Sequence, residues 1–67
     1  MVIDYLGHEL SEGDRVVFID IHYPMEFTKG FIEHIDPDGW VEVSYMHHAI
    51  GARFRQPVHP MKIIKCN

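Results

Sequence analysis

A tight turn between two strand-like runs sets the fold of this chain. Asp36-Pro37-Asp38-Gly39 stands between segments rich in β-branched and aromatic residues. Proline presets φ at the first turn position, aspartate tolerates the second, and glycine accepts a positive φ where a new strand begins. The sequence therefore predicts a β-hairpin over residues 30–45.

The run after the turn alternates with a period of two, which is typical of a half-buried strand. Its apolar members fall on every second residue, and the residues between them are of mixed type. We therefore expect Val41, Val43 and Tyr45 to face the core. The same alternation turns Trp40 and Glu42 outward.

The strand before the hairpin is apolar on both of its faces. Residues 15–21 are rich in β-branched and aromatic side chains, as a strand requires. Val16 and Phe18 alternate with Val17 and Ile19, so one set faces the core and the other is a candidate contact surface.

Local signals place the remaining elements. Gly30 opens the second strand and allows a close approach or a bulge, and Pro57 marks an edge or the end of a strand. A single helical turn is expected at His59-Pro60-Met61. A short last strand is expected after this helical turn. In all, strands are expected at residues 15–21, 29–36, 40–45, 53–58 and 62–66.

The chain is short enough to hold only one core. Its 67 residues predict a single domain, residues 1–67, without room for a deep substrate cavity. Because so small a core is marginally stable, self-association or binding to a partner is expected. No signal peptide or membrane-spanning segment is found, which predicts a cytoplasmic protein. Cys66 is the only cysteine, so no intrachain disulfide forms.

Charge is distributed unevenly along the sequence. Residues 1–42 hold all ten acids and two bases, a net charge of −8, whereas residues 43–67 hold four bases and no acid. The asymmetry favours separate acidic and basic surfaces that steer or dock a partner. Alternatively, strands distant in sequence pair and mix these charges.

The order of these elements resembles that of small SH3-like barrels. The resemblance covers nearly the whole chain. Its matching stretches are similar to those of KOW and Tudor-type domains, in which a glycine after a lysine begins the second strand. It implies an all-β, five-stranded SH3-like barrel with one short helical turn before the last strand. Because many functions share this fold, the resemblance carries no activity. The matching stretches are Gly13–Val17, Lys29–Ile32, Asp38–Val43 and Val58–Ile64.

No sequence pattern indicates catalysis, a cofactor or a metal. The same stretches are similar to type II dihydrofolate reductases, but the Val-Gln-Ile-Tyr motif of that family is absent at residues 54–58. His47, His48 and His59 have no His-x-His spacing that would set two ligands side by side. No serine, threonine or cysteine stands in a nucleophile context. We therefore expect a protein that is not an enzyme.

Two specialised binding roles stay open. A nucleic-acid-binding barrel of KOW type would use the basic C-terminal half for phosphate contacts, but the ten acids oppose it. Capture of a methylated lysine or arginine would need an aromatic cage. Aromatic residues are numerous enough for one, but their spacing does not define it; they are Tyr23, Phe27, Phe31, Trp40 and Tyr45.

Protein recognition is the role that the sequence favours. Aromatic residues on a half-exposed sheet are common interface anchors, and arginines often border them. The chain also resembles small accessory proteins of phages and mobile elements, many of which bind and inhibit one host protein. We expect a non-catalytic module that binds itself or a larger partner. Its expected partner-binding residues are Phe31, Trp40, Glu42, Arg53 and Arg55.

Overall fold

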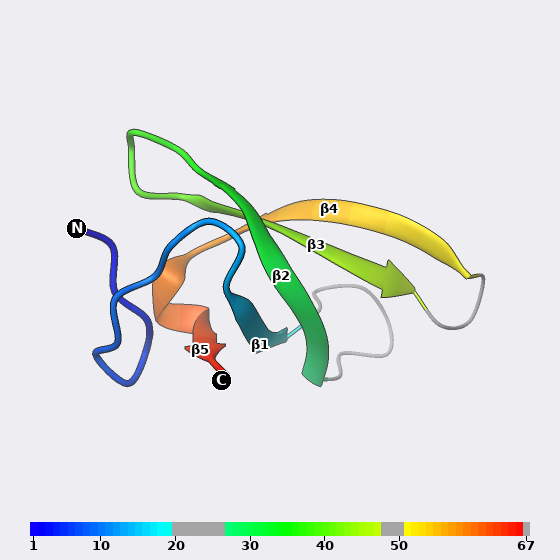
Figure 1. Cartoon of the computed structure of the whole chain (residues 1–67), viewed down its shortest axis with the longest axis horizontal. Coiled ribbons are helices and arrows are strands. Elements are labelled where there is room, and N and C mark those ends of the chain that lie inside the picture. The colour runs from blue at the N-terminus through cyan, green and yellow to red at the C-terminus, as the bar shows by residue number, and fades with distance from the viewer. Residues whose placement is uncertain (20–26, 48–50, 67) are drawn as a thin grey trace.

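The chain folds into one antiparallel sheet of five strands (Figure 1). The computed structural model describes residues 1–19, 27–47 and 51–66. The strands lie in the order β4-β3-β2-β1-β5, and a single 3-10 turn precedes the last strand. The predicted all-β class, strand number and position of the turn are confirmed. The elements are β1 (Arg15–Ile19), β2 (Phe27–Ile35), β3 (Val41–His47), β4 (Ala52–Val58), the 3-10 turn (Pro60–Lys62) and β5 (Ile63–Lys65).

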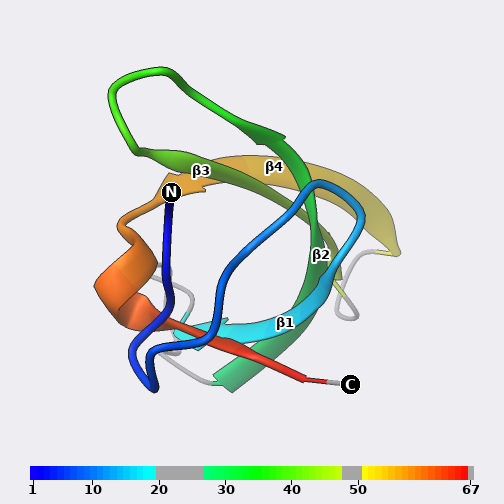
Figure 2. The ribbon, with the colours of Figure 1, turned by 60° about the vertical axis from the view of Figure 1, so that its left-hand side comes forward.

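The sheet curves around the core but does not close into the expected barrel (Figure 2). Its two edge strands are β4 and β5. The N-terminal segment occupies the outer edge of β5, where the Tyr5 amide donates to the Ile63 carbonyl at 3.0 Å. The Lys65 amide donates to the Asp4 carboxylate at 2.7 Å. β5 therefore bonds to the N-terminal segment rather than to β4.

The predicted turn is present between β2 and β3. The Gly39 amide donates to the Asp36 carbonyl at 2.9 Å, and the Asp36 amide donates to the Trp40 carbonyl at 2.8 Å. Gly39 has a φ of 96°, as the turn requires. The hairpin is confirmed, with β3 beginning one residue later than expected.

Replacing Gly39 with valine is expected to lower the free energy of unfolding by more than about 1 kcal/mol. A Cβ at this position would meet no atom within 4 Å, so the loss comes from forcing a positive φ on a β-branched residue. Thermal melts measure it. Gly39→Asn should lose less, because asparagine adopts this backbone region more readily. Equal melting temperatures for wild type and Gly39→Val would refute the strain at this turn.

The core lies on the concave side of the sheet. The predicted inward positions of β3 are all buried, and on β1 the buried set is Val16 and Phe18. Phe18 meets Tyr45 edge-to-face at a centroid distance of 5.3 Å. The Tyr45 hydroxyl donates to the buried Gln56 side chain at 3.1 Å, which satisfies two polar groups inside the core. The core residues are Leu10, Val16, Phe18, Ile32, Val41, Val43, Tyr45, Val58 and Ile63.

Two irregularities in the sheet follow from special residues. Pro57 lies on the edge strand β4, as its missing amide predicts. Gly30 is the site of a close approach to β3, whereas the bulge of β2 falls between Ile32 and His34. No helix in the described residues is long and apolar enough to cross a membrane.

Candidate binding face

Phe31 and Arg53, two of the predicted contact residues, lie together on the convex side of the sheet. The Arg53 guanidinium carbon lies 5.4 Å from the centroid of the Phe31 ring, within range of a cation–π contact. Arg53 also donates to the hydroxyl of the buried Ser44 at 3.3 Å. These contacts hold the arginine across β2, β3 and β4.

Glu42 and Arg55, two further expected partner-binding residues, form an ion pair. Their side chains approach to 3.7 Å between Glu42 Oε1 and Arg55 Nη1 on neighbouring strands. The Arg55 side chain is 59% exposed, so solvent screens this ion pair. The carboxylate nevertheless offsets the positive charge of the arginine locally.

Trp40 lies apart from Phe31. Its ring packs edge-to-face against His59 at a centroid distance of 5.4 Å, beyond the start of β3. Phe31 lies opposite Ser44 on β3. Ser44 is four residues beyond Trp40, which corresponds to about 13 Å of extended strand. The structure therefore does not join these two expected partner-binding aromatics into one apolar spot.

A larger apolar surface lies on the convex side of β2, β1 and β5. Residues directly opposite each other in a sheet share a face. Ile19 lies opposite Phe27, and Val17 lies opposite Ile64. Since Val17 and Ile19 are also two residues apart on β1, all four side chains project from the same face. The sequence indicated that one of the two faces of β1 is a contact surface, and the structure shows that it is the face with Val17 and Ile19. The cross-strand partners of these residues were not predicted.

These four residues line a groove of about 370 Å³. Phe27 is 74% exposed, and Ile19 is 45% exposed. Tyr5, Met61 and Lys62 complete the rim and come from the N-terminal segment and the 3-10 turn. The groove thus depends on four separate parts of the chain: the N-terminal segment, β1, the start of β2, and the 3-10 turn with β5.

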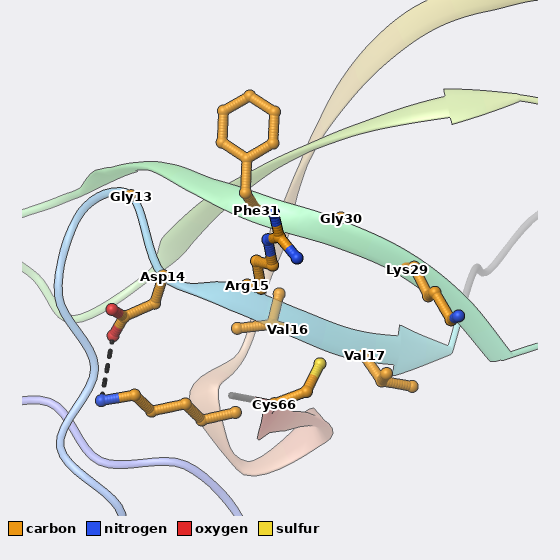
Figure 3. A pocket seen from close by; sticks show the side chains of 10 residues that line it. Gly13, Asp14, Arg15, Val16, Val17, Lys29, Gly30, Phe31 and Cys66 are labelled. Carbon is orange, nitrogen blue, oxygen red and sulfur yellow. Dashed lines mark ion pairs between the residues drawn. The ribbon is translucent and has the colours of Figure 1, made fainter.

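A second depression lies next to the groove and shares Val17 with it. Figure 3 shows the residues that line this second depression, which adds Arg15, Lys29, Phe31 and Cys66. Arg15 lies opposite Phe31, and Lys29 lies opposite Val17, so they project from the same side as the groove. We call the two depressions together the basic-apolar face.

An ion pair lies at the border of this face. Lys65 Nζ lies 3.5 Å from the Asp14 carboxylate, shown as the dashed line in Figure 3. The Lys65 ammonium also donates to the Glu9 carbonyl at 3.2 Å. Lys65 is therefore engaged within the chain, and its charge is offset by Asp14.

The buried Asp4 carboxylate anchors the N-terminal wall of the groove. Burial by itself raises the pKa of Asp4, but hydrogen bonds from three backbone amides and the nearby His8 side chain lower it below its ordinary value. The sequence analysis did not predict a structural role for Asp4, because no local pattern marks it. The amides belong to Leu6 at 2.9 Å, His8 at 2.8 Å and Lys65 at 2.7 Å.

The structure describes only part of the adjacent pair His47 and His48. His48 lies outside the described residues, as do Tyr23 and the rest of residues 20–26. Among residues 1–19, 27–47 and 51–66, no three histidine, cysteine or acidic side chains are grouped so that they could hold a metal ion.

Comparison with known proteins gives one family. The family described as Domain of unknown function (DUF7205) matches residues 2–63. No curated protein and no solved structure matches the chain. Because the match extends over nearly the whole sequence, the chain belongs to the DUF7205 family.

Proposed function

We propose that this chain is a small non-catalytic module that binds another protein through its basic-apolar face. The observation that supports this proposal most directly is that exposed apolar side chains line one groove. They include Ile19, Phe27 and Met61. Small soluble domains rarely expose a contiguous apolar surface without using it for recognition. A groove of this kind receives apolar side chains of a partner.

The residues that carry hydroxyl or thiol groups support a binding role over a catalytic one. Ser44 is fully buried, and its hydroxyl accepts a hydrogen bond from Arg53. Cys66 is a free thiol beside Arg15, where the described residues place no histidine that could act as its base. A nucleophilic mechanism would need a base and an orienting group at hydrogen-bond distance.

Nucleic-acid binding is the second candidate, favoured by Arg15, Lys29 and Arg53 around the Phe31 ring. Two of the four bases in the C-terminal half are, however, paired with carboxylates, Arg55 with Glu42 and Lys65 with Asp14. This pairing weakens the case for a phosphate-binding surface. A salt titration separates the candidates, because phosphate contacts give a steep loss of affinity with salt.

The double substitution Ile19→Ser and Phe27→Ser is expected to reduce partner binding by about 30-fold or more. Both side chains are exposed, so their replacement removes apolar contacts without opening the core. Tagged wild type and variant are expressed in the native host, and the proteins that co-purify with each are quantified. The affinity of the recovered partner is then measured by titration.

Trp40→Ala is the matched control for this experiment. Trp40 is another exposed large apolar residue, 43% exposed, but it lies beside His59, away from the groove. Its replacement should change partner affinity by less than about twofold. If the folded double variant keeps its partners while Trp40→Ala loses them, binding occurs at the hairpin end and the proposed face is wrong.

The finer expectations from the sequence belong to this proposal. They are the relationship to SH3-like barrels of KOW or Tudor type, the likeness to phage accessory proteins, the cytoplasmic location and self-association. Sedimentation over a range of concentrations tests self-association by measuring the mass of the species in solution. Thermal melts at several concentrations test it as well, since a dimer would make the melting temperature depend on dilution.

A further inference from the structure

The positive charges of the chain gather on the basic-apolar face although the net charge is −4. Four of the six lysines and arginines line its two depressions, whereas Asp14 is the only acid there among the described residues. Asp14 is paired with Lys65. The remaining three, Arg15, Lys29 and Lys62, have no carboxylate partner within the part of the chain that the structure describes.

Several of the described acids are engaged elsewhere. Glu12 and Asp36 approach opposite nitrogens of His34, at 2.9 and 3.4 Å. Glu42 approaches Arg55, and the Asp4 carboxylate is buried. Folding therefore pairs some acids of the N-terminal half with bases of the C-terminal half, Glu42 with Arg55 and Asp14 with Lys65, while the other described bases of this face stay unpaired with the described carboxylates.

The apolar part of the face combines aliphatic and aromatic side chains, and Lys29 and Lys62 lie at its borders. A concave apolar groove of this kind receives the anchoring side chains of a protein partner. The groove is lined by Val17, Ile19, Met61 and Ile64 together with Tyr5, Phe18 and Phe27. The net charge of −4 repels any strongly anionic partner at long range, so only the local cations of this face favour an anionic occupant.

Two copies of this face would not suit each other. An isologous dimer would gather Arg15 and Lys29 of both copies in one interface, where the described acid, Asp14, is already paired with Lys65. Like charges brought together at an interface are unfavourable. The face is complementary to an anionic surface that also carries apolar side chains.

We infer that the occupant of the basic-apolar face is an acidic protein segment with apolar anchors. This inference rests on the proposed function. The anchors enter the groove beside Ile19 and Phe27, while carboxylates of the segment meet Arg15, Lys29 and Lys62. An extended segment suits this arrangement, because its alternate side chains point the same way.

The probe is a fluorescein-labelled peptide of about ten residues in which leucine and glutamate take turns at every second position, with serine between them. An extended segment of this pattern presents both leucine and glutamate to one face. Binding to the full chain is followed by fluorescence anisotropy at physiological ionic strength. Replacing glutamate with glutamine, or leucine with serine, should weaken binding at least about tenfold in each case. An oligothymidylate strand is titrated alongside.

Lys29→Glu is expected to weaken binding of the acidic peptide at least about tenfold. Arg55→Glu is the matched control, since it makes the same change in net charge two strands away from β2. It should alter the affinity by less than about twofold, because charges beyond about 8 Å are screened at this ionic strength. Both lysine and arginine are exposed in the folded chain.

The outcomes separate this inference from the proposed function. The inference of an acidic occupant is overturned if the glutamate and glutamine peptides bind equally well. It is also overturned if the acidic peptide does not bind up to about 1 mM. The proposed face still stands in that case if Ile19→Ser with Phe27→Ser releases the native partner. Tighter, steeply salt-dependent binding of oligothymidylate overturns it in favour of nucleic acid. Concentration-dependent self-association that the double substitution abolishes overturns it in favour of a second copy.

Discussion

Gly30→Ala is expected to lower the free energy of unfolding by about 3 kcal/mol or more, through overpacking at the centre of the sheet. A Cβ built on Gly30 would lie 2.6 Å from the Ser44 carbonyl oxygen and 2.9 Å from a Val43 methyl carbon. The carbonyl belongs to the backbone of β3 and cannot rotate away. Because β2 is paired on both sides, the collision can be relieved only by disturbing the sheet.

The measurement is a denaturant or thermal melt of wild type and variant. A domain of this size has about 3–10 kcal/mol of stability in total, so much of the variant should be unfolded. Gly39→Ala serves as the control, since its added Cβ meets no atom within 4 Å and adds only backbone strain. At a compatible position, Gly→Ala stabilises a protein by restricting its unfolded chain. An unchanged or raised melting temperature for Gly30→Ala would therefore contradict the close approach.

Asp4→Ala is expected to lower the free energy of unfolding by about 3 kcal/mol, since three backbone amides lose their acceptor. Two of these amides, from Leu6 and His8, close the N-terminal turn, and the third belongs to Lys65 in β5. The carboxylate thus joins the two ends of the chain. Its loss should also loosen the groove wall that contains Tyr5.

The same carboxylate makes stability depend on acidity. Its pKa is lower in the folded chain than the unfolded value of about 3.9. Its contribution to stability is therefore complete above about pH 5 and is lost as the pH falls through the folded-state pKa. Melting temperatures measured across this range should fall more steeply for wild type than for Asp4→Asn.

Glu9→Gln is the control for the acid-dependent loss, because this neighbouring residue is exposed. It should keep the wild-type dependence on pH and nearly the wild-type stability. If Asp4→Asn melts at the wild-type temperature at neutral pH, the hydrogen bonds of this carboxylate do not stabilise the fold.

Short-range sequence patterns predicted the architecture closely. The turn at residues 36–39 and the alternation of Val41, Val43 and Tyr45 both depend on residues near each other in the chain. Pro57 predicted an edge strand because a missing amide acts locally, whatever the rest of the sheet does. Strand bounds differed from expectation by only a few residues.

The candidate site was less accessible to such patterns. Phe31 with Arg53, and Glu42 with Arg55, lie together as neighbours on one sheet surface, but Trp40 does not join them. Alternation assigns a residue to a face without giving its position along the neighbouring strand. That position follows from the register, which the sequence did not reveal.

By itself, the sequence determined the number of strands, the hairpin turn and which side of β3 is buried, because these depend on turn chemistry and a two-residue period. Tertiary structure decided the open sheet, the approach of Gly30 to β3 and the bond from Lys65 to Asp4, residues 61 positions apart. It also placed Ile19, Phe27 and Ile64 on one basic-apolar face. Contacts of this kind depend on which strands pair and in which register, and that is fixed only when distant segments pack around a common core.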